Sequence, residues 1–109
     1  MSAECKYSKG RPTQSATEQI AYLVDCANWA SAPTSPAVDY VWDETSGTNV
    51  KSTVMPSGSP AFTNAILTLP LLQLLTLGRR YRVEFSFTGA NSSRLEAHLR
   101  VECTTASTV

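Results

Sequence analysis

The sequence predicts an all-β domain: a single antiparallel β-sandwich preceded by an N-terminal arm. Short apolar runs recur at near-regular spacing, turn-forming residues separate them, and the last segment alternates strictly between apolar and polar residues. A chain of 109 residues can bury one core but not two independent ones. We therefore expect an arm over residues 1–16, the sandwich over 17–105 and a short tail over 106–109.

The strands of the first half are predicted from short apolar runs. Residues 18–25 are rich in strand-forming side chains and precede the turn-prone residues 31–36, so we expect the first core strand there. Residues 38–42 and 51–55 are expected to form two short strands joined by a turn centred on Gly47.

The middle of the chain predicts one further strand and a short helical segment. Residues 61–69 follow the chain break at Pro60 and are expected to form one strand, buried on much of both faces. The leucine-rich residues 70–78 predict one helical turn over the end of a sheet, with Gly78 as its stop. Trp29, just after the first strand, is expected to fill the core beneath a loop.

The last segment predicts a hairpin from Tyr81 to Cys103, because two alternating runs flank the turn-prone residues 89–93. Its outer face is charged and includes His98. The face expected to be buried consists of apolar side chains: Tyr81, Val83, Phe85, Phe87, Leu95, Ala97, Leu99, Val101 and Cys103.

Charge pairing favours one register for this hairpin. Opposite charges on paired strands are favourable and like charges are not. One register places Glu84 opposite Arg100 and Arg82 opposite Glu102, whereas the next in-phase register places Arg82 opposite Arg100. We therefore expect the first of the two.

The segment that enters the hairpin contains a specific cue. Leu75, Gly78, Tyr81 and Val83 match the Leu-x-x-Gly-x-x-Tyr-x-Val pattern and resemble the corner that precedes the penultimate strand of many fibronectin-type and immunoglobulin-like domains. In such a corner the Tyr81 hydroxyl bonds back to the preceding loop. The alternative is that Tyr81 is simply the first core residue of its strand.

Residue types that carry catalysis or bind metals are sparse. His98 is the single histidine, and no nucleophile elbow, phosphate loop or zinc motif occurs. Cys5, Cys26 and Cys103 are far apart in sequence, so we expect buried free thiols, with proximity of the last two left open. The sequence thus predicts no enzyme, no catalytic residues, no cofactor and no metal site.

Composition argues against several partner classes. Nine basic and nine acidic residues give no net charge, so no cationic field is available for nucleic acid or anionic lipid. The apolar stretch at residues 65–77 is too short and too interrupted to span a membrane. The polar N-terminal residues contain no apolar signal segment, so the default compartment is the cytoplasm.

The order of short motifs over residues 18–103 resembles a group of small tailed-bacteriophage structural proteins with an immunoglobulin-like fold. The shared pattern combines a first-strand motif, a glycine turn, a Thr-Leu-Pro step, the corner block and a final Arg-Val-x-Cys. Here these are Tyr22-Leu23-Val24-Asp25, Glu44-Thr45-Ser46-Gly47, Thr68-Leu69-Pro70, Leu75 to Glu84, and Arg100-Val101-Glu102-Cys103.

This resemblance implies a virion protein assembled in the host cytoplasm: a capsid decoration, or cement, protein that binds across major capsid subunits. Its partners would be the major capsid protein or another virion protein, in many copies, with self-association left open. The alternatives are a phage tail or neck accessory subunit, or an adhesive or carbohydrate-binding module.

Five residues are candidates for contact with such a partner. Lys6, Lys9 and Arg11 give the arm its positive charge, and Tyr40 and Trp42 share one face of a predicted strand. Removal of residues 1–16 is expected to leave the domain folded and to weaken its attachment.

Overall fold

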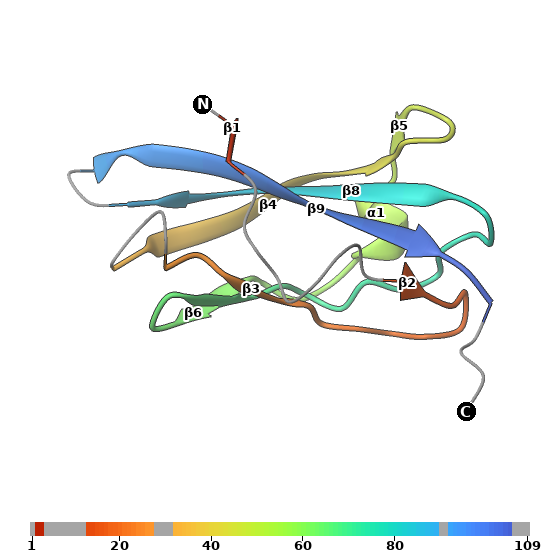
Figure 1. Ribbon diagram of the computed structural model, residues 1–109, viewed down its shortest axis with the longest axis horizontal. Coiled ribbons are helices and arrows are strands. Elements are labelled where there is room, and N and C mark those ends of the chain that lie inside the picture. Colours follow the sequence, from red (N-terminus) through yellow and green to blue (C-terminus); the bar gives the residue numbers. More distant parts are fainter. Residues whose placement is uncertain (1, 4–12, 28–31, 90–91, 106–109) are drawn as a thin grey trace.

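The computed structural model describes residues 2–3, 13–27, 32–89 and 92–105. Its structure is mainly β: two sheets face each other in two layers, and one helical turn closes an end of the core (Figure 1). This confirms the all-β prediction. The expected tail at 106–109 and the side chains of Trp29, Lys6, Lys9 and Arg11 lie outside the described residues.

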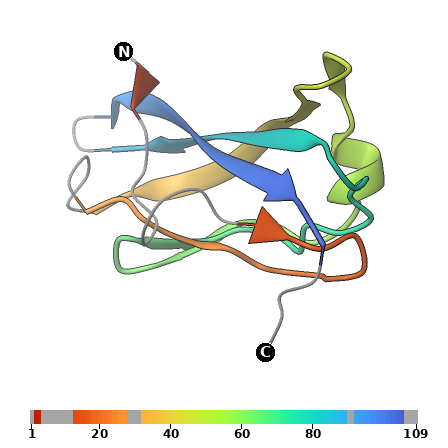
Figure 2. The same ribbon diagram turned by 45° about the vertical axis from the view of Figure 1, so that its right-hand side comes forward.

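The larger sheet has the strand order β1-β9-β8-β4-β5, with β2 also paired to β9. The smaller sheet has the order β3-β7-β6. Figure 2 shows the same two layers after rotation. The strands of the larger sheet are β1 (Ser2–Ala3), β2 (Thr13–Gln14), β4 (Thr34–Asp43), β5 (Thr48–Asn49), β8 (Arg80–Thr88) and β9 (Arg94–Cys103). Those of the smaller sheet are β3 (Leu23–Asp25), β6 (Ala61–Thr63) and β7 (Ile66–Thr68).

The hairpin β8–β9 forms the centre of the larger sheet, as predicted. Apolar side chains face the core at alternate positions along both strands, and Val83 and Val101 are completely buried, while Ser86 on the outer face of β8 is also buried. Across the core, the ring of Phe87 meets that of Phe62 edge to face, with centroids 5.6 Å apart. The period-2 pattern therefore assigned the correct face to these apolar residues.

The predicted register of this hairpin is wrong. Arg82 lies opposite Arg100, and Arg80 lies opposite Glu102. Glu44, just beyond β4, compensates for the like-charge pair, because its two oxygens lie 3.3 Å from Arg82 Nη1 and 3.4 Å from Arg100 Nε. The register differs from the predicted one by two positions in the pairing, so every side chain keeps its predicted face.

Strand β4 and the segment after it differ from the prediction. The strand begins at Thr34, inside the expected turn, and its pairing with β8 has irregularities between Thr34 and Ala37 and between Val38 and Tyr40. Gly47 closes the turn into β5 with a φ of 73°, as its position suggested.

Residues 51–55, predicted as a strand, instead form the helical turn α1 (Lys51–Val54) and its C-cap, Met55. Both Val54 and Met55 are buried. A strand would direct two consecutive side chains to opposite faces, whereas one helical turn at the end of the core can bury both.

Two other predictions in the middle of the chain are wrong. Residues 61–69 form a tight hairpin, β6–β7, because Asn64 adopts a φ of 56°, a conformation that asparagine tolerates better than most residues. Residues 70–78 are not helical. Their backbone bonds go to other segments: Leu72 exchanges both backbone bonds with Ile20, and the Gln73 N–H donates to Val54 O.

The first core strand is shorter than expected, since only Leu23–Asp25 belongs to a ladder. The isolated bridge between Ile20 and Leu72 extends the pairing at the edge of the smaller sheet. Cys26 and Cys103 are both buried, and neither belongs to a disulfide, as predicted, while Cys5 lies outside the described residues. Burial raises the pKa of the Cys103 thiol, so this group stays protonated at neutral pH.

Part of the predicted arm belongs to the folded domain. Strands β1 and β2 both pair in parallel with β9, and Gln14 is 1% exposed. The Gln14 side chain donates to Leu72 O at 2.6 Å and to Glu18 O at 2.9 Å, and it accepts the Tyr22 hydroxyl at 3.0 Å. The deletion of residues 1–16 would therefore remove two strands of the larger sheet and the buried Gln14 side chain.

Candidate functional site

The corner at Tyr81 contains the predicted hydrogen bond. The Tyr81 ring is buried, and its hydroxyl accepts the Thr76 N–H at 2.8 Å. Gly78 has a φ of 85° and donates its N–H to Cys103 O, while Leu75 is buried. These residues fix the entry of the chain into β8.

The outer face of the larger sheet is charged and held together by ion pairs. Glu44 bridges Arg82 and Arg100 on this face. A further ion pair joins Arg82 Nε to Glu84 Oε2 at 3.1 Å. His98 also lies on this face, opposite Glu84 in the ladder.

Asp43 is the buried member of this charged region. Its Oδ2 lies 2.6 Å from Arg79 Nη1, and its Oδ1 accepts the N–H groups of Thr45 and Ser46. Burial raises the pKa of Asp43, but the hydrogen bond from Arg79 and those two N–H groups outweigh it. The net pKa is therefore lowered, and Asp43 is ionised at neutral pH.

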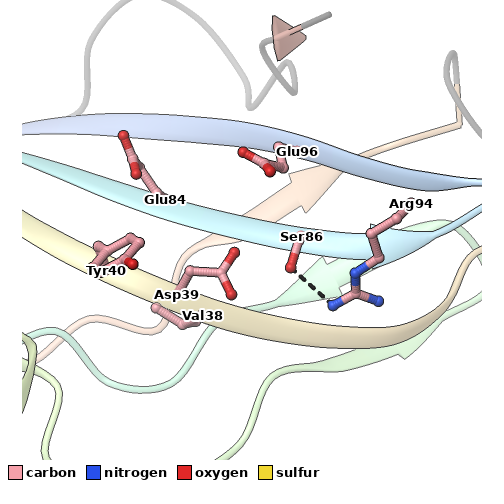
Figure 3. A pocket seen from close by; sticks show the side chains of 7 residues that line it. All are labelled: Val38, Asp39, Tyr40, Glu84, Ser86, Arg94 and Glu96. Atoms are coloured by element: carbon pink, nitrogen blue, oxygen red, sulfur yellow. Dashed lines mark hydrogen bonds between the residues drawn. The ribbon is translucent and has the colours of Figure 1, made fainter.

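A polar groove of about 530 Å³ lies on the same face, over strands β4, β8 and β9 (Figure 3). Its lining consists of Val38, Asp39, Tyr40, Glu84, Ser86, Arg94 and Glu96. Tyr40 is 45% exposed and stacks on Trp42 with ring centroids 5.3 Å apart. The structure thus places these two predicted contact residues together, one of them in the wall of a groove.

Arg94 occupies one end of the groove, and three of its five N–H donors are hydrogen-bonded there. It donates to Ser35 O at 2.7 Å, Thr88 Oγ1 at 3.0 Å and Ser86 Oγ at 2.8 Å. These acceptors are all neutral. Arg94 therefore fastens β9 across β8 to the start of β4 and forms no ion pair with a groove carboxylate.

The smaller sheet has fewer charges, although Asp25 on β3 is exposed. No charged residue occurs between Lys51 and Arg79, the part of the chain that includes β6, β7 and the leucine-rich segment. Within the described ranges, four of the five exposed large apolar side chains lie here or on β3. We call them the leucine surface: Leu23, Leu71, Leu74 and Leu77, which are 46% to 62% exposed.

Sequence reasoning missed both the groove and the leucine surface. The groove joins three strands that only the ladder pairing brings together. The leucine surface was not foreseen because residues 70–78 were predicted to form a helical turn over the end of a sheet. The uncharged run from residue 52 to 78 was a usable signal.

The described part of the chain contains no group of three or more His, Cys, Asp or Glu side chains arranged to hold a metal ion. Across the same residues, no helix has the length and hydropathy needed to cross a bilayer.

Comparison with known proteins found no matching family model, no similar curated protein and no similar solved structure. The function is therefore argued from the two surfaces themselves.

Proposed function

We propose that this chain is a non-enzymatic virion structural protein with an immunoglobulin-like fold, and most simply a capsid decoration (cement) protein. The observation that carries the proposal is the leucine surface, three of whose four residues lie in the charge-free run 52–78. Exposed apolar side chains are typical of the centre of a protein interface, where charged groups are depleted.

The division of charge between the two sheets supports an attached component. A freely diffusing domain needs no face without charge, whereas a part of a particle turns one face to its neighbours and another to water. In this arrangement the leucine surface would contact the major capsid protein and the charged larger sheet would face outward. Binding would stabilise the assembled shell because it adds free energy only to the assembled state.

The motif order described above supports a phage source, and the two-sheet architecture is compatible with it. A tail or neck subunit would use the same uncharged face on a different neighbour. A carbohydrate-binding module would instead depend on the Tyr40–Trp42 stack. Loss of glycan binding on Tyr40→Ala, with particle attachment absent in the wild type, would favour that alternative.

The test is co-sedimentation of the purified protein with particles that lack it. We expect the wild type to bind, Leu74→Glu and Leu77→Glu to lose at least tenfold in affinity, and the matched control Glu102→Gln to bind normally. Electron microscopy of the reconstituted particles then separates shell from neck and tail. Normal binding by both glutamate variants would refute the role of the leucine surface.

A further inference from the structure

Most of the leucine surface lies on a segment that has no strand or helix of its own. Residues 70–78 carry Leu71, Leu74 and Leu77, and within the described structure their ladder-type pairing is limited to an isolated bridge at Leu72. A segment of this kind takes its shape from hydrogen bonds to other parts of the chain. The shape of the leucine surface therefore depends on the groups that hold this backbone.

Leu72 is held by two donors from outside the segment. Its carbonyl accepts the Ile20 N–H at 3.1 Å and the Gln14 side-chain amide at 2.6 Å. The Leu72 side chain is completely buried, whereas Leu71 and Leu74 on either side of it are 46% and 62% exposed. An inward-facing anchor thus separates two outward-facing leucines.

The backbone at Leu74 is constrained. Its φ of 57° lies in the left-handed region, which a bulky side chain rarely adopts. Such a conformation persists only where the surrounding structure enforces it. Before it, the Gln73 N–H donates to Val54 O at 2.8 Å. After it, the Thr76 N–H donates to the Tyr81 hydroxyl at 2.8 Å. Leu74 is therefore held outward by bonds on both sides.

Gln14 connects this segment to the larger sheet. It belongs to β2, pairs with Cys103 of β9, and accepts the Thr104 N–H at its backbone oxygen at 3.0 Å. The Tyr22 hydroxyl donates to Gln14 Oε1 at 3.0 Å, which orients the amide so that its Nε2 donates to Leu72 O. Because Gln14 is 1% exposed, water does not replace these bonds.

We propose that Gln14 is a positioning residue for the leucine surface: by holding Leu72 from β2, it keeps Leu71 and Leu74 in the arrangement that a partner protein binds. Pairing of β2 with β9 and presentation of these leucines are thereby coupled. Ordering a surface before binding lowers the free-energy cost of association. A truncation that removes Gln14 would then weaken attachment even where the N-terminal residues do not touch the partner. The binding role of this coupling rests on the proposed function.

The first experiment tests the coupling without any partner, by amide hydrogen exchange. Gln14→Met keeps the length of the side chain and removes its amide, and Val101→Ala is a control with a comparable loss of core stability far from residues 70–78 in the sequence. We expect the amides of Leu72, Gln73 and Thr76 to exchange at least tenfold faster in Gln14→Met than in Val101→Ala. Equal exchange at these amides in the two variants would overturn the positioning role, because it would reflect global stability alone.

The second experiment measures co-sedimentation with particles that lack the protein, at a temperature where all variants are folded. We expect Gln14→Met to lose at least tenfold in affinity and Val101→Ala to bind as the wild type does. Tyr22→Phe removes the hydroxyl that orients the Gln14 amide and should show a smaller loss, so it serves if Gln14→Met does not fold.

The two experiments fail in different ways. A wild type that does not sediment with particles would overturn the proposed function, and with it the binding role of Gln14, while the exchange result would still stand or fall by itself. Attachment of the wild type together with normal attachment of folded Gln14→Met and Tyr22→Phe would overturn the positioning role alone.

Discussion

The two sheets differ in how their outer faces meet water. The larger sheet carries a network in which Glu44 joins two arginines, and a groove with two further carboxylates. The smaller sheet and the segment that follows it expose leucines and, from residue 52 to 78, carry no charge at all. Ion pairs between strands stabilise the outer face of the larger sheet and keep it hydrated. The scarcity of charge around the exposed leucines leaves that region suited to contact with another protein.

The largest loss of stability is expected when the hydrogen bonds between β2 and the smaller-sheet side are removed. Gln14→Ala should lower the free energy of unfolding by about 3 kcal/mol, because it removes the three hydrogen bonds that the buried Gln14 amide makes with Leu72 O, Glu18 O and the Tyr22 hydroxyl, each worth about 1 kcal/mol. Chemical denaturation measures this change. The exposed Gln19→Ala is the control and should stay within about 0.5 kcal/mol of the wild type. A small loss for Gln14→Ala would mean that the two sheets are held together without it.

The next effect concerns the corner between the uncharged segment and the charged sheet. Tyr81→Phe should cost about 1 kcal/mol, because the Thr76 N–H loses its acceptor while the ring remains buried. Thermal and chemical unfolding measure the loss. An unchanged stability would show that Tyr81 contributes only as a core residue.

The bridging role of Glu44 in the larger sheet can be tested by removing its charge. Glu44→Gln should cost up to about 1 kcal/mol, since it leaves Arg82 and Arg100 opposed without a bridging carboxylate in a partly exposed position. The difference from the wild type should shrink at high salt. Glu96→Gln, which removes a carboxylate without an ion pair among the described residues, should cost less. Equal effects of the two substitutions would argue against the bridging role of Glu44.

The charged sheet should also weaken in acid. The pKa of Asp43 is lowered in the folded state, so its contribution is fully present above the unfolded-state pKa of about 4 and is lost as pH falls through the folded value. Asp43→Asn should therefore show a smaller loss of stability between about pH 5 and pH 2 than the wild type. Parallel curves for the two proteins in acid unfolding would contradict this assignment.

The smallest effect on stability is expected on the leucine surface. Leu77 is 58% exposed, so Leu77→Glu should change the free energy of unfolding by less than about 0.5 kcal/mol. Binding to particles, by contrast, should fall sharply. A variant that loses several kcal/mol in denaturation would show that Leu77 supports the fold and not an interface.

The sequence pattern correctly predicted those features whose geometry depends on neighbouring residues in the chain. The strict alternation in residues 81–103 identified the hairpin and the buried face of both strands, because a strand's period of two is independent of what it pairs with. The turn at Gly47 and the hydrogen bond of the Tyr81 corner were also predicted correctly, since their geometry depends on a few consecutive residues.

The errors arose where distant segments decide the outcome. The register was misjudged because the carboxylate that separates Arg82 from Arg100 comes from Glu44, nearly forty positions earlier in the chain. Residues 70–78 contain enough leucine for a helix, yet their backbone groups bond to Ile20 and Val54 in other segments.

The sequence by itself determined that this chain is a β protein with a central alternating hairpin, because hydrophobic periodicity depends only on the order of residues. Only the tertiary structure decided which charges meet, that Gln14 is buried, that a polar groove forms across the larger sheet, and that leucines of β3 and of residues 70–78 are exposed. The physical reason is that ion pairs, buried hydrogen bonds and surfaces form between residues brought together by folding, and their energies depend on distance in space.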